Sequence, residues 1–598
     1  MPFDWVRTTR TELVRPLSAG AALLVLTLAA YVPAMRGGFV WDDDALLTDN
    51  RNIRSLEGLG RSWIDPRANL DYYPLTYTSW WLEYRLWGLW PAGYHADNVL
   101  LHAAVAVLAW RILRRLAVPG AWLAAAVFAV HPLNVQSVAW VAERKNVLSG
   151  VFALLAAWCF VRSVEAADEG GGRRGASFYG LSLAAYAAAM LAKPMTMALA
   201  AALPLLAWWK RGRPTWRDAA AAAAYLALAA PMAAVTIWVQ YRHVGASGEA
   251  FGYAPAERVL IAGRALWFYA GKLAWPQDLC FVYPKWQVDA GDWRQYLFPA
   301  GAAGVVAALA LARRRLGPGP LVGVLFFVVM LSPALGFVNV YWYAYYYVAS
   351  HMPYLAALGL VAVGAGAAAR AAARMPPWGR RAAAVAAAGV LTILAAISWH
   401  GGGAYEDAET LWRHTLASNP DAWIAHNNLG NILQDRGEAD QALAHYRETL
   451  RLAPDFAPAH ANLAVILIGK DRLDEAAYHC REALRVRPDL TRARTNLGSI
   501  LAAQGRAEDA IGEFLAALRA DPSDLPAMGN LAEVLRIVGR SDEAAHWYRA
   551  CADAARRQGR QDMAARCEER LADLRRSPAG APAATPAPGG GRPPGGGP

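Results

Sequence analysis

The sequence predicts an all-α protein in two parts: a helical bundle embedded in a membrane, followed by a solenoid of helical repeats. Two observations support this. Of the 598 residues, 56% are hydrophobic and only 18% are charged, and apolar runs of about 18 to 22 residues, long enough to cross a bilayer, recur until about residue 400. Beyond that point these runs stop and a period of 34 residues begins.

Eleven apolar runs are expected to cross the membrane. A further run, residues 258–275, is expected to be a re-entrant or interfacial helix, because counting it as a crossing would invert every later loop. The eleven expected spans are residues 17–34, 97–113, 121–138, 147–163, 177–192, 195–209, 218–240, 296–312, 319–337, 353–370 and 382–398.

Basic side chains predict the orientation of these spans. The formal net charge is +11, and its excess lies in the membrane part, which favours a role in topology over nucleic-acid binding. All the basic clusters face one side if the N-terminus is cytoplasmic. We therefore expect residues 1–403 to be a multi-pass domain of the cytoplasmic (inner) membrane. The first loop, residues 35–96, and everything from residue 404 onward would then be extracytoplasmic, or periplasmic.

The 34-residue period is the tetratricopeptide (TPR) pattern. It predicts a half repeat, four full repeats and a capping helix over residues 404–576, with a concave groove for acceptor or partner proteins. The Pro/Gly-rich tail, residues 577–598, is expected to be disordered. Cys551 and Cys567 could pair. The periodic positions are Asn428, Asn462, Asn496 and Asn530, with Pro420, Pro454, Pro488 and Pro522.

Three adjacent carboxylates, Asp42, Asp43 and Asp44, follow the first span by a few residues. Partial desolvation there raises a carboxylate pKa towards that of a useful base, which could take a proton from an acceptor hydroxyl. An ordinary acidic loop, or a Ca²⁺ site built from Asp42, Asp44 and Asp49, would explain the same residues.

The first loop ends in a helix on which His95, Asn98 and His102 share one face, at i, i+3 and i+7. Lipid offers no hydrogen bonds, so these side chains must meet protein or water. A structural network and a substrate site are both open interpretations. No metal site is predicted, because His95 and His102 are about 10 Å apart along the helix, and no other cofactor is expected.

The later outside loops carry charge and aromatic rings. His131, Glu143, Arg144, Lys145 and Lys193 lie there, against the positive-inside bias, so the cations are candidates to hold a phosphate head group. Snorkelling to lipid phosphates is the alternative. The last loop gathers tyrosines around His351 and Tyr354, as an aromatic belt or as stacking platforms for a sugar.

The ordered motifs FVWDDDALLTDNRNI, YYPLTYTSWWLEYRLWGLWPAGYHADNVLLH, HPLNVQSVAWVAERKNVLSG, LAKPMTMAL and VASHMPYLAALG precede the TPRs. In this order they resemble the transmembrane-and-TPR protein O-mannosyltransferases and their bacterial relatives. The resemblance implies a GT-C type membrane glycosyltransferase fold. It also implies a polyprenyl- or dolichyl-phosphate sugar donor, a Ser or Thr acceptor hydroxyl, and a catalytic carboxylate in the first outside loop, here Asp43 or Asp42.

The same resemblance implies a set of substrate- and donor-binding residues. One departure is Ser350, where relatives usually have an acidic residue before the histidine. The expected function is transfer of a sugar, mannose, to extracytoplasmic proteins. A membrane-anchored TPR scaffold without catalysis, and a GT-C enzyme acting on a lipid-linked glycan, are the alternatives. The implied binding residues are His95, Asn98, His102, His131, Glu143, Arg144, Lys145, Lys193, His351 and Tyr354.

Overall fold

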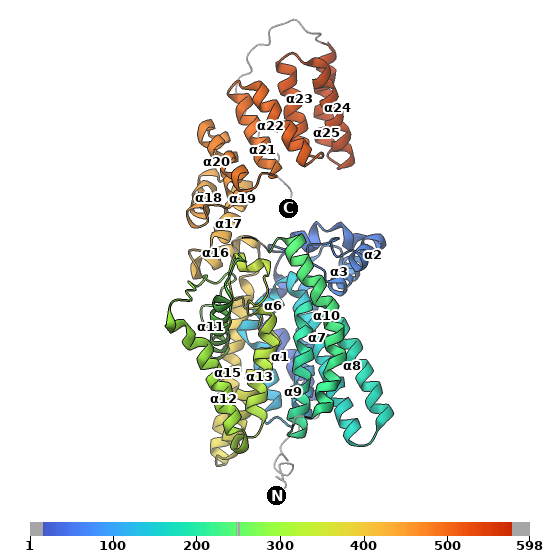
Figure 1. The fold of residues 1–598 in the computed structure, drawn as a ribbon, viewed down its shortest axis with the longest axis vertical. Helices are drawn as coiled ribbons and strands as arrows, with labels where there is room; N and C mark the ends of the chain where they lie inside the picture. Colours follow the sequence, from blue (N-terminus) through green and yellow to red (C-terminus); the bar gives the residue numbers. More distant parts are fainter. Residues whose placement is uncertain (1–15, 214, 247, 249–250, 577–598) are drawn as a thin grey trace. The chain divides into compact units, whose positions relative to one another are not determined.

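The computed structural model describes residues 16–213, 215–246, 248 and 251–576, and the regular structure in these residues is entirely helical (Figure 1). The all-α prediction is therefore confirmed. The chain divides into two compact units, the first ending at Pro420 and the second beginning at Asp421. The expected disordered tail, residues 577–598, lies outside the described residues.

The first unit is a bundle of apolar helices that run side by side (Figure 1). Helix α7 packs against α4 and α8, α13 packs against α9 and α14, and α1 packs against α4 and α5. The helices of the bundle are α1 (Pro16–Ala30), α4 (Pro91–Arg115), α5 (Ala121–Val130), α7 (Arg144–Asp168), α8 (Gly172–Ala192), α9 (Leu199–Arg211), α10 (Trp216–Val239), α12 (Leu297–Leu316), α13 (Gly319–Leu331), α14 (Ala357–Ala373) and α15 (Pro377–Gly403).

Among the described residues, six helices are long and apolar enough to cross a membrane, or seven if one bent pair counts as a single span. Eleven spans are therefore not shown. The bent pair, Ala121–Val130 and Pro132–Ala139, turns by 52° at His131. The six candidate spans are Pro91–Arg115, Val141–Asp168, Gly172–Ala192, Trp216–Val244, Trp293–Leu316 and Pro377–Gly403.

The four other expected spans coincide with shorter helices: α1, α9, α13 and α14. Proline accounts for two of these cases. Pro194 begins a 3₁₀ turn before α9, and Pro333 lies in the 3₁₀ turn that follows α13. In both places the proline stands in the first positions of a 3₁₀ turn, so the α-helix covers only part of the expected span. Pro204 and Pro231, by contrast, lie inside α9 and α10 without ending them.

Shorter elements are interspersed with the bundle helices. They include α2 (Leu56–Ile64) and α3 (Pro74–Trp87) from the first loop, which lie together at one end of the bundle (Figure 1), and α6 (Val135–Ala139) after α5. Helix α11 (Pro255–Ala274), expected to be interfacial or re-entrant, is not among the candidate spans of the described residues. It packs against α12 and α14.

The second unit consists of antiparallel helix pairs that repeat every 34 residues, as predicted. The spacing is regular because the same small residues pack at each helix crossing. The alanines expected at the helix crossings, such as Ala442 and Ala476, are fully buried. A disulfide between Cys551 and Cys567 joins the last two helices. The helices are α17 (Trp423–Asp435), α18 (Ala439–Leu452), α19 (Ala457–Gly469), α20 (Leu473–Val486), α21 (Thr491–Ala503), α22 (Ala507–Ala520), α23 (Leu525–Ile537), α24 (Ser541–Arg557) and α25 (Gln561–Arg576).

The helix expected as the half repeat, α16 (Ala408–Ser418), belongs to the first unit. Its Trp412 occupies the large position of the repeat pattern and is 2% exposed. The ring packs edge-on against Trp41, with centroids 5.7 Å apart, and against Phe281 at 5.6 Å. This aromatic position therefore joins α16 to the segment that carries the three adjacent carboxylates.

Candidate active site

The Asp42–Asp44 segment begins with an unusual backbone conformation at Trp41. Its φ of 49° lies in the left-handed region, which is uncommon for a residue with a large side chain. The Trp41 ring stacks on Trp140, with a centroid distance of 5.5 Å and an interplanar angle of 16°. This turn directs the next two carboxylates, Asp42 and Asp43, into different environments.

Asp43 is completely buried and hydrogen-bonded to the backbone. One carboxylate oxygen accepts from the Val40 N–H at 2.8 Å, and the other accepts from the Ala142 N–H at 2.6 Å. Ala142 lies 99 residues away, so Asp43 ties the first outside loop to the second. With both oxygens engaged and no exposed surface, its geometry suits a structural role.

Asp42, by contrast, keeps some solvent-accessible surface and is only partly buried. Burial raises its pKa to about 6, opposed by the positive charge of Lys145 and reinforced by the negative charges of Asp71 and Glu143. A carboxylate with this pKa is ionised at neutral pH yet retains a much higher proton affinity than a solvated aspartate. Asp42 can therefore bind and release a proton near neutral pH.

A cluster of charged side chains surrounds Glu143, which is 1% exposed. The Glu143 carboxylate lies between two ammonium groups, with Lys145 Nζ at 3.2 Å and Lys193 Nζ at 3.1 Å. Lys193 also donates to Asn146 Oδ1 at 2.8 Å. Burial lowers the pKa of Lys193 to about 8, while the charge of Glu143 works in the opposite direction. One carboxylate thus holds two cations in place.

His351 completes the cluster without adding charge. Its Nε2 lies 3.9 Å from a Glu143 oxygen, and burial lowers its pKa to about 3, so the ring is neutral at pH 7. Asn146 donates to the His351 carbonyl at 2.8 Å. The preceding residue, Ser350, shares a hydrogen bond of 2.8 Å with the Tyr283 hydroxyl.

Arg144 lies beside the cluster in sequence but is engaged elsewhere. Its side chain is 1% exposed and pairs with Glu83 of α3. It also donates to Asn98 Oδ1 at 2.5 Å and to the Tyr94 carbonyl at 2.9 Å. Arg144 therefore fastens α7 to α3 and α4, and none of these contacts leaves its guanidinium facing the cluster.

The three polar residues of α4 share one face, as their spacing predicts, and each contacts protein. His95 Nε2 lies 3.1 Å from the Gly38 carbonyl oxygen, and Asn98 donates to the Trp140 carbonyl at 3.1 Å. His102 bonds Tyr354 Oη at 2.7 Å and the Ala129 carbonyl at 3.0 Å. These contacts match the structural-network interpretation of this face.

His131 has a similar structural environment. Its Nδ1 accepts from the Leu133 N–H at 3.1 Å, and its Nε2 donates to the Leu273 carbonyl at 3.0 Å. It therefore fastens the bend between α5 and α6 to the end of α11. Of the implied binding residues, only Glu143, Lys145, Lys193 and His351 gather in the charged cluster.

Sequence reasoning missed several members of this region. Asp71, whose pKa is raised by burial, accepts from Gln240 Nε2 at 3.1 Å. Asn146 orients Lys193, and Glu83 neutralises Arg144. A lone acidic residue within the Trp-rich helix α3 was a signal for Glu83, because a buried carboxylate requires a partner. No group of three or more His, Cys, Asp or Glu that could hold a metal ion occurs among the described residues.

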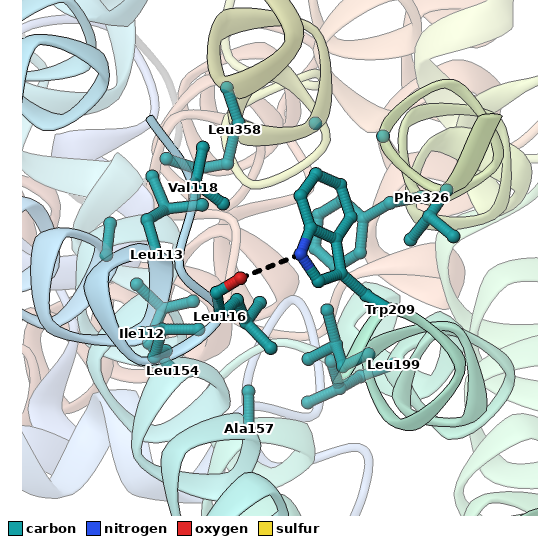
Figure 2. A pocket seen from close by; sticks show the side chains of 16 residues that line it. Ile112, Leu113, Leu116, Val118, Leu154, Ala157, Leu199, Trp209, Phe326 and Leu358 are labelled. Atoms are coloured by element: carbon teal, nitrogen blue, oxygen red, sulfur yellow. Dashed lines mark hydrogen bonds between the residues drawn. The ribbon is translucent and has the colours of Figure 1, made fainter. Parts of the chain in front are cut away.

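An apolar pocket lies between α4, α7, α9, α13 and α14 (Figure 2). Leu154, Phe326 and Leu358 line it, and Trp209 crosses it to donate to the Leu116 carbonyl at 2.9 Å. The pocket contains none of the predicted site residues.

Comparison with known proteins finds a repeat family and distant relatives that match part of the chain. The family described as tetratricopeptide repeat matches residues 401–455, 428–491, 479–524 and 495–559. The protein O-mannosyl-transferase TMTC3 of Mus musculus is 33% identical over 152 residues, covering 24% of this chain and 16% of the relative. The protein O-mannosyl-transferase TMTC4 of Homo sapiens is 26% identical over 208 residues, covering 31% and 28%.

The matched segments span less than a third of the length of these relatives. Among solved structures, the crystal structure of MamA aligns with 25% of this chain and 88% of its own, at 17% identity and a TM-score of 0.24. The chain is a distant relative, over part of its length, of the TMTC protein O-mannosyltransferases, and it combines TPR repeats with several apolar helices.

Proposed function

We propose that the protein is a GT-C type membrane glycosyltransferase that moves mannose from a polyprenyl-phosphate donor to Ser or Thr hydroxyls of extracytoplasmic proteins. The observation that carries the proposal is Asp42, a partly buried carboxylate with its pKa raised to about 6, beside a cluster that holds two lysines. The similarity to protein O-mannosyl-transferases supports the same chemistry.

In this proposal Asp42 is the general base and Asp43 holds it in place. The Asp42 carboxylate takes the proton of the acceptor hydroxyl, whose oxygen forms a bond to the anomeric carbon. The bond from that carbon to the lipid phosphate breaks, its electron pair leaves with the phosphate oxygen, and the anomeric configuration inverts. Asp43 positions Asp42 because its two backbone hydrogen bonds fix the turn.

The leaving phosphate develops negative charge that must be neutralised. Lys145 and Lys193 are placed for this task, since both contact one Glu143 carboxylate and neither is exposed to bulk water. Glu143 and Asn146 act as positioning residues for the two ammonium groups. Arg144 takes no part in this step, because Glu83, Asn98 and Tyr94 occupy its guanidinium.

The placement of the parts relative to the membrane belongs to the same proposal. The N-terminus is cytoplasmic, and the end of the bundle that carries Asp42 and the TPR unit face the extracytoplasmic space, where acceptor proteins are found. The TPR unit binds acceptor or partner proteins, since stacked helix pairs form an extended concave surface.

The test is sugar transfer from a polyprenyl-phosphate-mannose donor to extracytoplasmic protein in membranes that contain the full chain. Asp42→Asn removes the base with little change in shape, and we expect transfer to fall by about 10³-fold. Asp49→Asn, the same change at an exposed position of the same segment, is the matched control and should retain activity.

Asp43→Asn distinguishes a positioning role from that of the base. In this variant an amide NH₂ group would face one of the two backbone N–H groups that Asp43 binds, so we expect less of the protein to fold. Full activity of a folded Asp42→Asn variant would refute the assignment of the base. If the wild-type chain transfers neither mannose nor any other sugar from a lipid phosphate, the TPR scaffold becomes the better explanation. Transfer to a lipid-linked glycan instead of protein would favour the second alternative.

A further inference from the structure

A second pocket, with a more polar lining than the pocket of Figure 2 and separate from it, opens within the first unit. It has a volume of about 820 Å³, within the range of ordinary ligand sites. Helices α15 and α16, the loop at residues 276–281 and the bend between α5 and α6 form its walls. Its lining includes Gln136, Gln277, Phe281, Ser350, Tyr405 and His414.

Gln136 lines this pocket and carries a buried donor that is unsatisfied. The side chain is 3% exposed, and its Oε1 accepts from the His351 N–H at 3.1 Å, which fixes the orientation of the amide. Its Nε2 has no hydrogen-bond partner among the described residues. A buried N–H without an acceptor is unfavourable, so a shift of the Gln136 side chain that brings Nε2 to an oxygen of a ligand in the pocket would be stabilising.

The charge of the pocket distinguishes it from the cluster around Glu143. Among the described residues that line it, none is Lys or Arg, and Asp278 is the acidic one. A phosphate therefore has no cation here, whereas Lys145 and Lys193 provide two in the cluster. The pocket is lined by carboxamides and hydroxyls together with Phe281, Tyr405 and two prolines. Such a lining suits a neutral polypeptide, whose carbonyls accept hydrogen bonds and whose side chains pack on the rings.

The pocket and the charged cluster are joined through two residues. Gln136 accepts from the His351 N–H, and His351 Nε2 lies 3.9 Å from Glu143. Trp140, which stacks on the Trp41 ring beside Asp42, also contacts the His351 ring, with centroids 6.2 Å apart. A chain bound in the pocket is therefore adjacent to the residues proposed to act on the donor.

The geometry points to this pocket as the site that holds a neutral stretch of acceptor polypeptide, with the Gln136 side-chain amide donating to a peptide carbonyl. This inference rests on the proposed function, since it supplies the acceptor side of that reaction. The two substrates are then sorted by charge, the anionic donor to the lysines and the neutral acceptor to the pocket.

The experiment measures binding of a fluorescent, uncharged peptide that contains Thr to the full chain in detergent, without any sugar donor. Gln136→Leu removes the donor, and we expect the Kd to rise about tenfold, the equivalent of one hydrogen bond to a buried group. Gln287→Leu, the same change at an exposed position outside the pocket, should leave the Kd unchanged.

A second variant covers the case in which Gln136→Leu fails to fold. His414 is exposed on α16, so His414→Trp should narrow the pocket without disturbing the core and should also weaken peptide binding. Inorganic phosphate should not displace the peptide. No peptide binding by the wild-type chain, unchanged binding in a folded pocket variant, or displacement by a neutral oligosaccharide would each overturn the inference.

The two proposals fail in different ways. Peptide binding that depends on the pocket, in a protein that transfers no sugar, would overturn the proposed function and leave the pocket inference standing. Sugar transfer that depends on Asp42, together with a peptide Kd that the Gln136 and His414 variants do not change, would overturn the pocket inference and leave the proposed function standing.

Discussion

Replacing Asp42 with Asn is expected to stabilise the folded protein while removing its proposed base. Burial raises the pKa of this carboxyl from 3.8 to about 6, so the folded state binds its proton more tightly than the unfolded state does. Ionisation of Asp42 therefore reduces the stability of the wild-type protein as pH rises from about 4 to about 6. Asn does not titrate and escapes this loss.

The size of the effect follows from the two pKa values. The difference between about 6 and 3.8, at 1.36 kcal/mol for each pKa unit, corresponds to about 3 kcal/mol in favour of Asp42→Asn above pH 7. About half of this difference should be present at pH 5, and almost none below about pH 3. The carboxylate is thus expected to be kept at the expense of stability, as is common at functional sites.

The assay is thermal unfolding of purified full-length protein in detergent at pH 5 and pH 8, for wild type, Asp42→Asn and the exposed control Asp49→Asn. The unfolding midpoint of Asp42→Asn should exceed that of wild type by more at pH 8 than at pH 5, and the control should follow wild type. A variant less stable than wild type at pH 8 would refute the reasoning, because the ionised carboxylate would then be a structural partner of Lys145.

Three further predictions concern other parts of the molecule. Transfer activity, measured as kcat/KM against pH, should rise as Asp42 ionises near pH 6 and fall as Lys193 loses its proton near pH 8. Lys193→Arg should remove the alkaline fall. A pH profile of Lys193→Arg that equals that of wild type would exclude Lys193 from the reaction. Arg144→Ala leaves Glu83 buried without its partner, at a cost of about 3 to 5 kcal/mol in stability. The yield of folded protein in membranes should therefore drop sharply. A well-folded but inactive variant would instead indicate that Arg144 takes a direct part in the reaction. Gly498→Ala places a methyl group 2.8 Å from the Phe514 ring and should lower the unfolding midpoint of the TPR unit through overpacking of about 1 to 3 kcal/mol, while Gly512→Ala, which meets no neighbour within 4 Å, should not.

The repeats were the part most readily predicted, because their determinants are local and recur. Each small residue at a helix crossing and each proline after a second helix is repeated at the same spacing, and the buried Ala442 and Ala476 occupy the predicted places. The shared face of His95, Asn98 and His102 is also local, since the geometry of one helix decides it. Even there, the identity of their partners required the structure.

The number of spans is confirmed only in part, since hydropathy records composition and not the continuity of a helix. Pro194, between two expected spans, begins a 3₁₀ turn that takes up the first residues of the second span, and Pro333 lies in a 3₁₀ turn within the run expected to span residues 319–337. The repeat family matches the region of the half repeat, residues 401–455. Its pattern did not reveal that α16 packs with the first unit through Trp412.

The sequence by itself determined the all-α class, the repeat period and the set of polar motifs in which a site had to be found. Only the tertiary structure distinguished Asp42 from Asp43, because the turn at Trp41 sends one carboxylate towards Lys145 and the other onto two backbone N–H groups. Likewise, it paired Arg144 with Glu83, 61 residues apart, and left Lys145 and Lys193 around Glu143. Burial and partnership set the charge and reactivity of a side chain, and both depend on residues that are distant in sequence.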